Sequence, residues 1–276
     1  MKTIAIINQK GGVGKTTTAV NLSAALARAG ERVCLVDLDP QAHASLHLGQ
    51  SVEEGEGSIY QVLTGEARIS EVVRKVEDNL CLVPSHLDLA AAEMELSAEV
   101  GRELILRDAI GEYAPTLDYL LIDCPPSLGV LTLNALTAAK NVMLPLQPHF
   151  LALHGLSKLL GTIEIVSRRL NPGLRLTGIA LCMYESGTRL AAEVSRDVES
   201  FFSMQQETAG PWRNTQTHQT RIRRNIRLAE APSHGQSIFD YAPHSHGAQD
   251  YACLAQEILE LTLEAESPNV ALSGAA

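Results

Sequence analysis

The sequence predicts a doubly wound α/β fold, with a mostly parallel sheet of seven or eight strands and helices on both faces. Short apolar runs rich in β-branched residues, typical of buried parallel strands, alternate with helical patterns along most of the chain. The first apolar run leads through a glycine turn directly into a helix, and two later runs end in aspartates. With 276 residues, the chain is long enough to bury the core of one such domain.

The expected elements follow from these patterns in chain order. The strands are expected at 4–7, 32–41, 80–84, 118–126, 141–146 and 174–184. The helices are expected at 14–29, 42–49, 58–63, 70–76, 86–99, 102–110, 151–169, 188–204 and 247–266. The polar segment 50–57 is expected to be a loop, and 205–220 is polar and receives no assigned role. We expect residues 1–265 to form a single domain and 266–276 a flexible tail.

Composition limits the class of protein and its partners. No signal peptide precedes the first strand, and no apolar run approaches the roughly 18 residues that a membrane span needs, so a cytoplasmic location is expected. The five cysteines are scattered without a C-x-x-C pair, which favours free thiols over a metal site. Because the formal net charge is −10, any contact with nucleic acid must come from a local basic patch.

The turn after the first strand has the residues of a phosphate-binding loop. Glycines allow the backbone amides to approach phosphate oxygens closely, and the amino end of the following helix attracts anions. Lys15 would reach the β- and γ-phosphates, and the Thr16 hydroxyl would ligate Mg²⁺. The loop departs from the usual G-x-x-x-x-G-K-[ST] pattern, because Gln9 takes the first glycine position and a second lysine, Lys10, lies inside it.

Aspartates end two of the predicted strands. Asp37 and Asp39 follow the second strand, and Asp123 ends the fourth. In an open parallel sheet ligands bind beyond the carboxyl ends of the strands, so these side chains are expected near the phosphates. Asp123 would organise the water shell of Mg²⁺. A single aspartate at such a place can also be a helix cap or a turn former, and that interpretation stays open for each of the first two.

Four segments in this order resemble the deviant Walker A P-loop ATPases of the ParA/MinD family, in particular the chromosome-partition (Soj-like) branch. They are KGGVGKTT, LVDLDPQ, DCPPSLG and RNIRLAEAPSHG. The resemblance implies ATP and Mg²⁺ as ligands, with ATP held by Lys10, Gly11, Gly12, Val13, Gly14, Lys15, Thr16 and Thr17. It also implies that Lys10 reaches the nucleotide of a partner subunit, so that ATP bridges a homodimer.

The same resemblance implies roles for three further side chains. Asp39 would position the attacking water and help Thr16 and Asp123 hold Mg²⁺, whereas Asp37 would be more structural. The catalytic set would then be Lys10, Lys15 and Asp39, and Asn225 would lie beside the adenine.

An arginine-rich segment is the candidate DNA contact. Five arginines fall between 213 and 227 without an acidic residue among them. Guanidinium groups suit phosphate oxygens, which makes Arg221, Arg223, Arg224 and Arg227 candidate contacts to the DNA backbone. A solvated arginine-rich face is the alternative.

The chain departs from the family pattern at a few positions. His149 and His154 replace two glutamates, and Arg223 replaces a proline. These two histidines could titrate near neutral pH, although solvent-facing substitutions are the simpler interpretation. The closing helix is acidic and lacks the basic amphipathic character of a membrane-binding helix, which points away from a membrane partner.

The resemblance implies an ATP-dependent partition switch. Its ATP-bridged dimer would bind nucleoid DNA without sequence preference, and a ParB-like centromere-binding partner would stimulate hydrolysis and release it. Three alternatives remain: a related ATPase that positions another cargo, a metabolic P-loop enzyme, and a cluster-carrying reductase. The metabolic enzyme would need a substrate pocket, and 50–115 offers no obvious set of catalytic residues.

Overall fold

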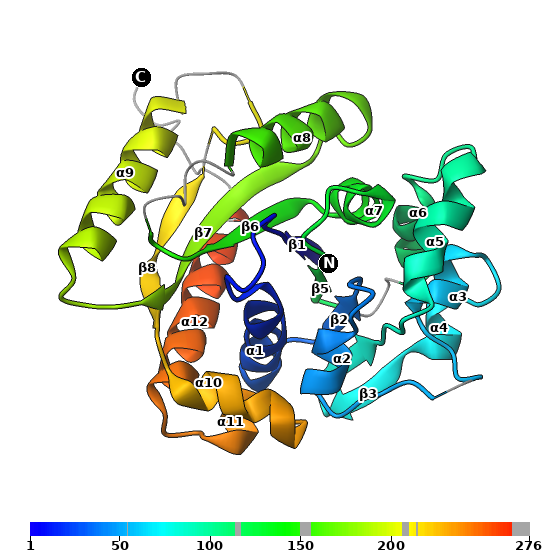
Figure 1. Cartoon of the computed structure of the whole chain (residues 1–276), viewed down its shortest axis with the longest axis horizontal. Helices are drawn as coiled ribbons and strands as arrows, with labels where there is room; N and C mark the ends of the chain where they lie inside the picture. Colours follow the sequence, from blue (N-terminus) through cyan, green and yellow to red (C-terminus); the bar gives the residue numbers. More distant parts are fainter. Residues whose placement is uncertain (54, 114–116, 150–155, 206–209, 214, 267–276) are drawn as a thin grey trace, which may run out of the picture.

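The computed structural model describes residues 1–53, 55–113, 117–149, 156–205, 210–213 and 215–266 (Figure 1). His154 and the expected tail beyond 266 lie outside these residues. Eight strands form one sheet in the order β3-β4-β2-β5-β1-β6-β7-β8. They are β1 (Lys2–Ile6), β2 (Val33–Asp37), β3 (Arg74–Glu77), β4 (Leu80–Val83), β5 (Tyr119–Asp123), β6 (Asn141–Leu146), β7 (Arg175–Tyr184) and β8 (Gln216–Arg223). Neighbouring strands are parallel except for β3 and β4, which confirms the predicted fold class.

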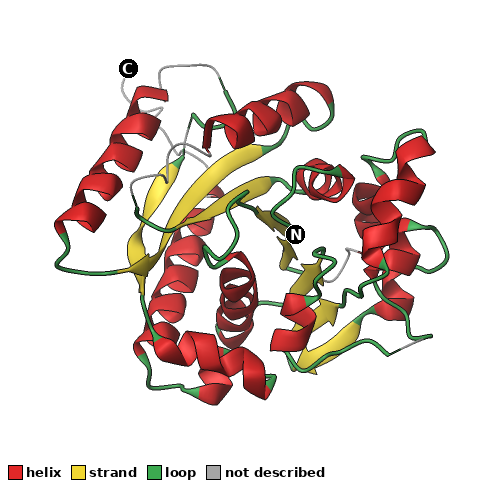
Figure 2. Cartoon of the chain, in the orientation of Figure 1, coloured by secondary structure: helices red, strands yellow, loops and turns green. Residues whose placement is uncertain are grey.

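Helices cover both faces of the sheet (Figure 2). They are α1 (Lys15–Arg28), α2 (His43–His47), α3 (Ile59–Leu63), α4 (Ile69–Val72), α5 (Leu89–Glu95), α6 (Ile105–Tyr113), α7 (Val130–Ala138), α8 (Leu156–Arg169), α9 (Arg189–Gln205), α10 (Ile226–Glu230), α11 (Ile238–Tyr241) and α12 (His246–Glu266). The apolar residues of α1 and α12 share one buried cluster with one face of the sheet. Residues of α3 to α9 share the cluster on the other face.

The sheet extends in both directions from the central strand β1, which lies between β5 and β6. After β1 the chain first forms β2, β3 and β4 on one side of the sheet. It then forms β5 next to β1 and adds β6, β7 and β8 on the other side. In register, Asp123 at the end of β5 is beside Ile6 of β1 on one side and Asp37 of β2 on the other. Ligands of doubly wound sheets bind outside the carboxyl ends of strands at such a switch point.

The two edge strands differ from the sequence prediction. The helix expected at 70–76 is wrong beyond Val72, because the chain turns into β3 and pairs antiparallel with β4. At the opposite edge, β8 was not expected, since its sequence is mainly polar and only His218 and Ile222 are fully buried within it. An edge strand with one solvated side needs no continuous apolar run, so periodicity does not reveal it.

Candidate nucleotide site

The loop between β1 and α1 is anchored by its own side chains. The Asn8 side-chain amide donates to the Pro145 carbonyl at 2.8 Å, and its oxygen accepts from the Lys10 backbone amide at 3.0 Å. Gly12 and Gly14 have φ values of 72° and 96°, a region that favours glycine. Gly14 is also the N-cap of α1 and offers no side chain to its first amides. Those amides are therefore available to an anion at the positive end of the helix.

Lys15 is a buried cation at the start of that helix. Its side chain reaches back to the Lys10 carbonyl, with 3.4 Å between nitrogen and oxygen, and the residue is only 7% exposed. Burial lowers the pKa of Lys15, and the nearby carboxylates of Asp123 and Asp39 oppose this effect. A buried ammonium group beside unpaired helix amides is costly unless an anion lies between them, so the arrangement fits a polyphosphate.

Asp123 is the second buried charge of the site. It is fully buried, and neither carboxylate oxygen has a hydrogen-bond partner in the described part of the chain. Burial and the neighbouring Asp37 raise the pKa of Asp123 well above its usual range, and the Thr16 hydroxyl opposes the rise. Unpartnered carboxylate oxygens beside a second carboxylate, Asp39, and a hydroxyl are a donor set that suits Mg²⁺. The residues present therefore fit the expected cation.

Asp37 and Asp39 have different surroundings although they are two residues apart. Asp37 is buried and accepts hydrogen bonds from the Ser45 amide at 2.8 Å, the Ser45 hydroxyl at 2.7 Å and the Asp39 amide at 3.2 Å. Burial raises the pKa of Asp37 to about 6. The Ser85 amide donates to the Ser45 hydroxyl, and the Ser85 hydroxyl donates to the Asp39 carbonyl at 2.8 Å. The two serines thus fix the end of β2 in place. Because they lie far apart in the sequence, their positions did not indicate this role.

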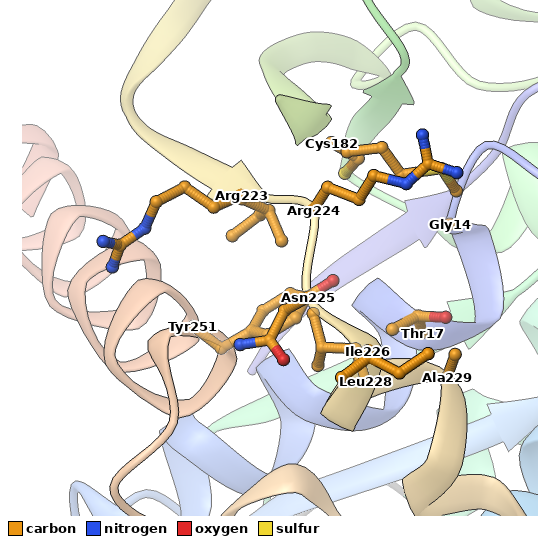
Figure 3. Close-up of a pocket in the computed structure, with 12 residues that line it drawn as sticks. Gly14, Thr17, Cys182, Arg223, Arg224, Asn225, Ile226, Leu228, Ala229 and Tyr251 are labelled. Atoms are coloured by element: carbon orange, nitrogen blue, oxygen red, sulfur yellow. The ribbon is translucent and has the colours of Figure 1, made fainter. Parts of the chain in front are cut away.

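A pocket of about 520 Å³ opens beside Gly14 and Thr17 (Figure 3). Its walls come from the start of α1, the ends of β7 and β8, the start of α10 and Tyr251 of α12. Asn225 lines it and caps α10, because its side-chain oxygen accepts from the Arg227 amide at 2.9 Å. Met183, another wall residue, has a φ of 50°, a strained conformation of the kind found at functional sites. The mainly apolar pocket next to the phosphate loop has the character of a base-binding site.

Lys10 lies outside this buried region. It is exposed, and its ammonium group hydrogen-bonds to Nε2 of His149. Burial and the adjacent Lys10 charge lower the pKa of His149, so that the neutral imidazole can accept this bond. The structure therefore places His149 beside the loop, and it leaves the Lys10 side chain directed at its own chain.

The four candidate DNA arginines are each paired with a carboxylate. Arg221 pairs with Glu199 at 3.2 Å, Arg223 with Asp250 at 2.6 Å, Arg224 with Glu185 at 2.9 Å, and Arg227 with Glu230 at 2.7 Å. All four acids lie outside the segment 213–227, so these four arginines are not the unopposed positive charge that the segment alone suggested.

The neighbouring arginines Arg223 and Arg224 point in opposite directions (Figure 3). Arg223 extends toward α12, where its backbone amide and its guanidinium group both donate to the buried Asp250. Arg224 extends away from α12 and is largely exposed. Of these two, Arg224 is the more exposed, with 71% of its side chain accessible against 38% for Arg223.

No helix that the structure describes is long and apolar enough to cross a membrane.

Comparison with known proteins gives consistent results. A family model described as an AAA domain matches residues 1–176. The sporulation initiation inhibitor protein Soj of Bacillus subtilis is 43% identical over 93% of this chain and 98% of its own length. The chromosome partitioning protein ParA of Myxococcus xanthus is 44% identical over 93% of this chain and 87% of its own.

A solved structure with the same fold has a different description. It is a cobyrinic acid a,c-diamide synthase from Mycobacterium smegmatis with bound ATP analog and magnesium, and it superposes with a TM-score of 0.81. The identity is 35%, and the match covers 96% of this chain and 97% of that one.

Proposed function

The chain belongs to the AAA-domain family of ATPases that includes the ParA and Soj chromosome-partitioning proteins, and from this membership we propose that it is an ATP-driven DNA-partition switch. ATP would bridge two copies of the chain, and the dimer would bind nucleoid DNA without sequence preference. Hydrolysis to ADP and phosphate would return it to monomers in the cytoplasm. A ParB-like partner, which holds the centromere sequence, would stimulate that step.

The observation that carries this proposal is the buried Lys15 ammonium group together with the buried Asp123 carboxylate, whose oxygens have no hydrogen-bond partner in the described part of the chain. Lys15 would bind the β- and γ-phosphates of ATP, together with the backbone amides from Gly11 to Thr17. Thr16, Asp39 and Asp123 would hold Mg²⁺, which when bound would neutralise charge on the phosphate oxygens. The apolar pocket would take the adenine, with Asn225 at its edge.

Hydrolysis needs a group that orients water toward the γ-phosphate. Asp39 is only 7% exposed, and one of its oxygens already accepts from the Gln41 amide at 2.9 Å. The fixed carboxylate can accept a hydrogen bond from the attacking water and so align it. Asp37 cannot do this as readily, because its oxygens accept from Ser45 and Asp39.

Lys10 would supply the connection between subunits. In this structure it is exposed, and its ammonium group hydrogen-bonds to the neutral imidazole of His149. A second phosphate chain with several negative charges would attract it more strongly than a neutral acceptor does. Lys10 would therefore leave His149 when a partner subunit presents its nucleotide.

DNA binding would depend on the exposed arginines of the segment 213–227. Arg221, Arg224 and Arg227 would exchange their carboxylate partners for backbone phosphates, whereas Arg223 would stay with Asp250. The pairs of Arg224 and Arg227 are exposed, and exposed ion pairs contribute little free energy, so the exchange costs little at these two positions. A dimer doubles the number of phosphate contacts, which would couple DNA affinity to ATP.

Retention on DNA measured with ATP, with ADP and without nucleotide tests the proposal. We expect retention only with ATP, and we expect it on any DNA sequence. Equal retention in the three conditions, or none with ATP, would contradict it.

A second candidate is a metabolic P-loop enzyme, which the diamide synthase with this fold favours. The two candidates differ in what accelerates ATP hydrolysis. A partition switch would respond to DNA together with a ParB-like protein, whereas a cobyrinic acid a,c-diamide synthase would respond to cobyrinic acid. A related switch that positions another cargo would bind DNA with ATP but would not respond to the ParB-like protein.

A further inference from the structure

Glu93 of α5 lies against Gly129, the N-cap of α7. A methyl group on Gly129 would lie 2.0 Å from Oε1 of Glu93 and 3.1 Å from its carboxyl carbon. The backbone of Gly129, with φ of −80° and ψ of −169°, is open to other residues. A side chain at this position would therefore displace the flexible end of Glu93, although the backbone conformation itself would accept it.

The surroundings of the Glu93 carboxylate do not satisfy one of its oxygens. Its Oε1 is buried and has no hydrogen-bond partner in the described part of the chain. Since Gly129 gives α7 no side-chain cap, the first amides of α7 also lack a cap beside this carboxylate. A negative charge near a helix N-terminus is favourable. A buried oxygen without a hydrogen-bond partner costs free energy, so its presence calls for a reason other than packing.

Gly129 ends the segment that begins at Asp123. Two consecutive prolines, Pro125 and Pro126, restrict this short connection. The Thr132 hydroxyl, in the first turn of α7, donates to the Ser127 carbonyl at 2.6 Å. Because the connection is short and restrained, a displacement of the start of α7 is transmitted toward Asp123.

The α5–α6 layer is also joined to α7 further along the helix. The Asn134 side-chain amide donates to the Arg102 carbonyl at 2.7 Å, and its oxygen accepts from the Leu106 amide at 3.0 Å. The layer therefore holds α7 at two places: Asn134 in the helix, and Glu93 at the end that continues from the nucleotide site.

We propose that Glu93 is a positioning residue for ATP hydrolysis, which fixes the place of segment 124–129 and thereby of Asp123. This proposal rests on the metal-binding role of Asp123 proposed above, and it does not depend on DNA binding. Glu93 acts by attracting the first amides of α7 and by occupying the space at Gly129. Its loss would leave the phosphate loop intact, so kcat should fall while KM for ATP should change little.

A double-mutant cycle on ATP turnover, without DNA or a partner protein, tests the proposal. Glu93→Ala should lower kcat about tenfold, because a small misplacement of a reacting group has effects of this size or larger. Gly129→Ala should also lower it, since its methyl group would push the Glu93 carboxylate out of its place beside the start of α7. In the Glu93→Ala background the methyl group has room, so Gly129→Ala should cause no further loss. Glu93→Gln, which keeps an oxygen acceptor of the same size, should recover most of kcat.

Glu99→Ala is the matched control, because it removes an exposed carboxylate from the same layer and should leave kcat unchanged. The proposal is wrong if Glu93→Ala keeps the wild-type kcat, or if Gly129→Ala causes the same loss in both backgrounds. If Gly129→Ala does not fold, the comparison of Glu93→Ala with Glu93→Gln tests the proposal instead. Equal losses in kcat in these two variants would overturn the role of Glu93 as a positioning residue. Asp123→Ala tests the proposed function separately. Full ATPase activity in that variant would contradict the metal-binding role of Asp123, whereas a loss there with no effect of Glu93→Ala would contradict only the role of Glu93.

Discussion

At the scale of single residues, the site contains two buried ionisable groups of opposite sign, a lysine and an aspartate. Burial lowers the pKa of Lys15 and raises the pKa of Asp123, so it favours the neutral form of each group. Such groups reduce the stability of the chain without ligand, and natural proteins keep them where they have a function. The Lys15 ammonium group and the Asp123 carboxylate are what an anionic nucleotide and a divalent cation would respectively satisfy.

Asp39→Ala should separate binding from hydrolysis. Without the water-orienting carboxylate, the rate of hydrolysis should fall by about two to four powers of ten, the usual range for such a group. ATP binding should survive, because Lys15, Thr16 and Asp123 remain. Single-turnover hydrolysis and equilibrium binding of ATP measure the two effects. A loss of affinity without a trapped ATP complex would instead make Asp39 mainly a ground-state ligand of Mg²⁺.

The Asp37 carboxyl should give the nucleotide-free protein a distinct pH dependence. Its pKa of about 6 in the folded state is above the value of about 3.9 expected in the unfolded chain. The folded state therefore binds the proton more tightly, and unfolding between these values releases a proton. As the pH rises from about 4 to about 6, the free energy of unfolding should decrease because of this group.

Asp37→Asn should remove that contribution. Urea unfolding of both proteins between pH 4 and pH 7 should show a difference in free energy that changes across the window and then levels off. A constant difference would show that Asp37 does not titrate in this range.

At the scale of elements, prediction succeeded where one segment carries its own signal. The strand, glycine loop and helix at 4–29, and the strands that end in Asp37 and Asp123, occur as expected because apolar runs and turn residues are local features. The edge strands β3 and β8 were missed, since pairing with a neighbour and not periodicity determines them. The helix α7 was also not expected, although it carries the residues that follow Asp123.

The chemistry of the site was predictable only in part, for the same reason. The loop and the aspartates could be identified from spacing along the chain. The serines that fix Asp37, the pocket wall from β7, and the acids that pair with the arginines come from distant positions. Such contacts exist only after folding, so a single sequence does not reveal them.

The pair of Arg223 and Asp250 should hold the edge strand β8 on α12. Arg223→Ala should lower the free energy of unfolding by about 1 to 3 kcal/mol, because a nearly buried carboxylate loses its charged partner. Arg224→Ala is the matched control, since it removes an exposed pair with Glu185 and should change stability by less than about 1 kcal/mol. Urea denaturation compares them, and equal effects would contradict a special role for Arg223.

At the scale of the whole molecule, the account requires a dimer to overcome the charge of the chain. A protein of formal charge −10 is repelled by DNA unless its exposed basic residues act together. One chain offers few such residues in the segment 213–227, because four of its five arginines are paired with carboxylates. Two chains bridged by ATP would present twice as many, and each neutralised phosphate contributes about −0.9 to the log–log salt slope.

Arg224→Glu and Arg227→Glu should each weaken binding to all DNA sequences alike and reduce the salt slope. ATP-driven dimerisation should stay intact, and it must be measured in the same variants because Asn225 lies between these two positions. Binding to immobilised DNA over a range of salt concentrations gives both quantities. If both variants keep wild-type affinity as dimers, the DNA surface lies elsewhere.

The ATP-bridged dimer is the central claim, and sedimentation of the purified chain with Mg²⁺ and either ATP or ADP tests it most directly. We expect a dimer with ATP and a monomer with ADP. Lys10→Ala should bind ATP but stay monomeric, while Lys75→Ala, which removes an exposed lysine on β3, should dimerise normally. A monomer with both nucleotides, or a normal ATP dimer of Lys10→Ala, would contradict the ATP-bridged dimer.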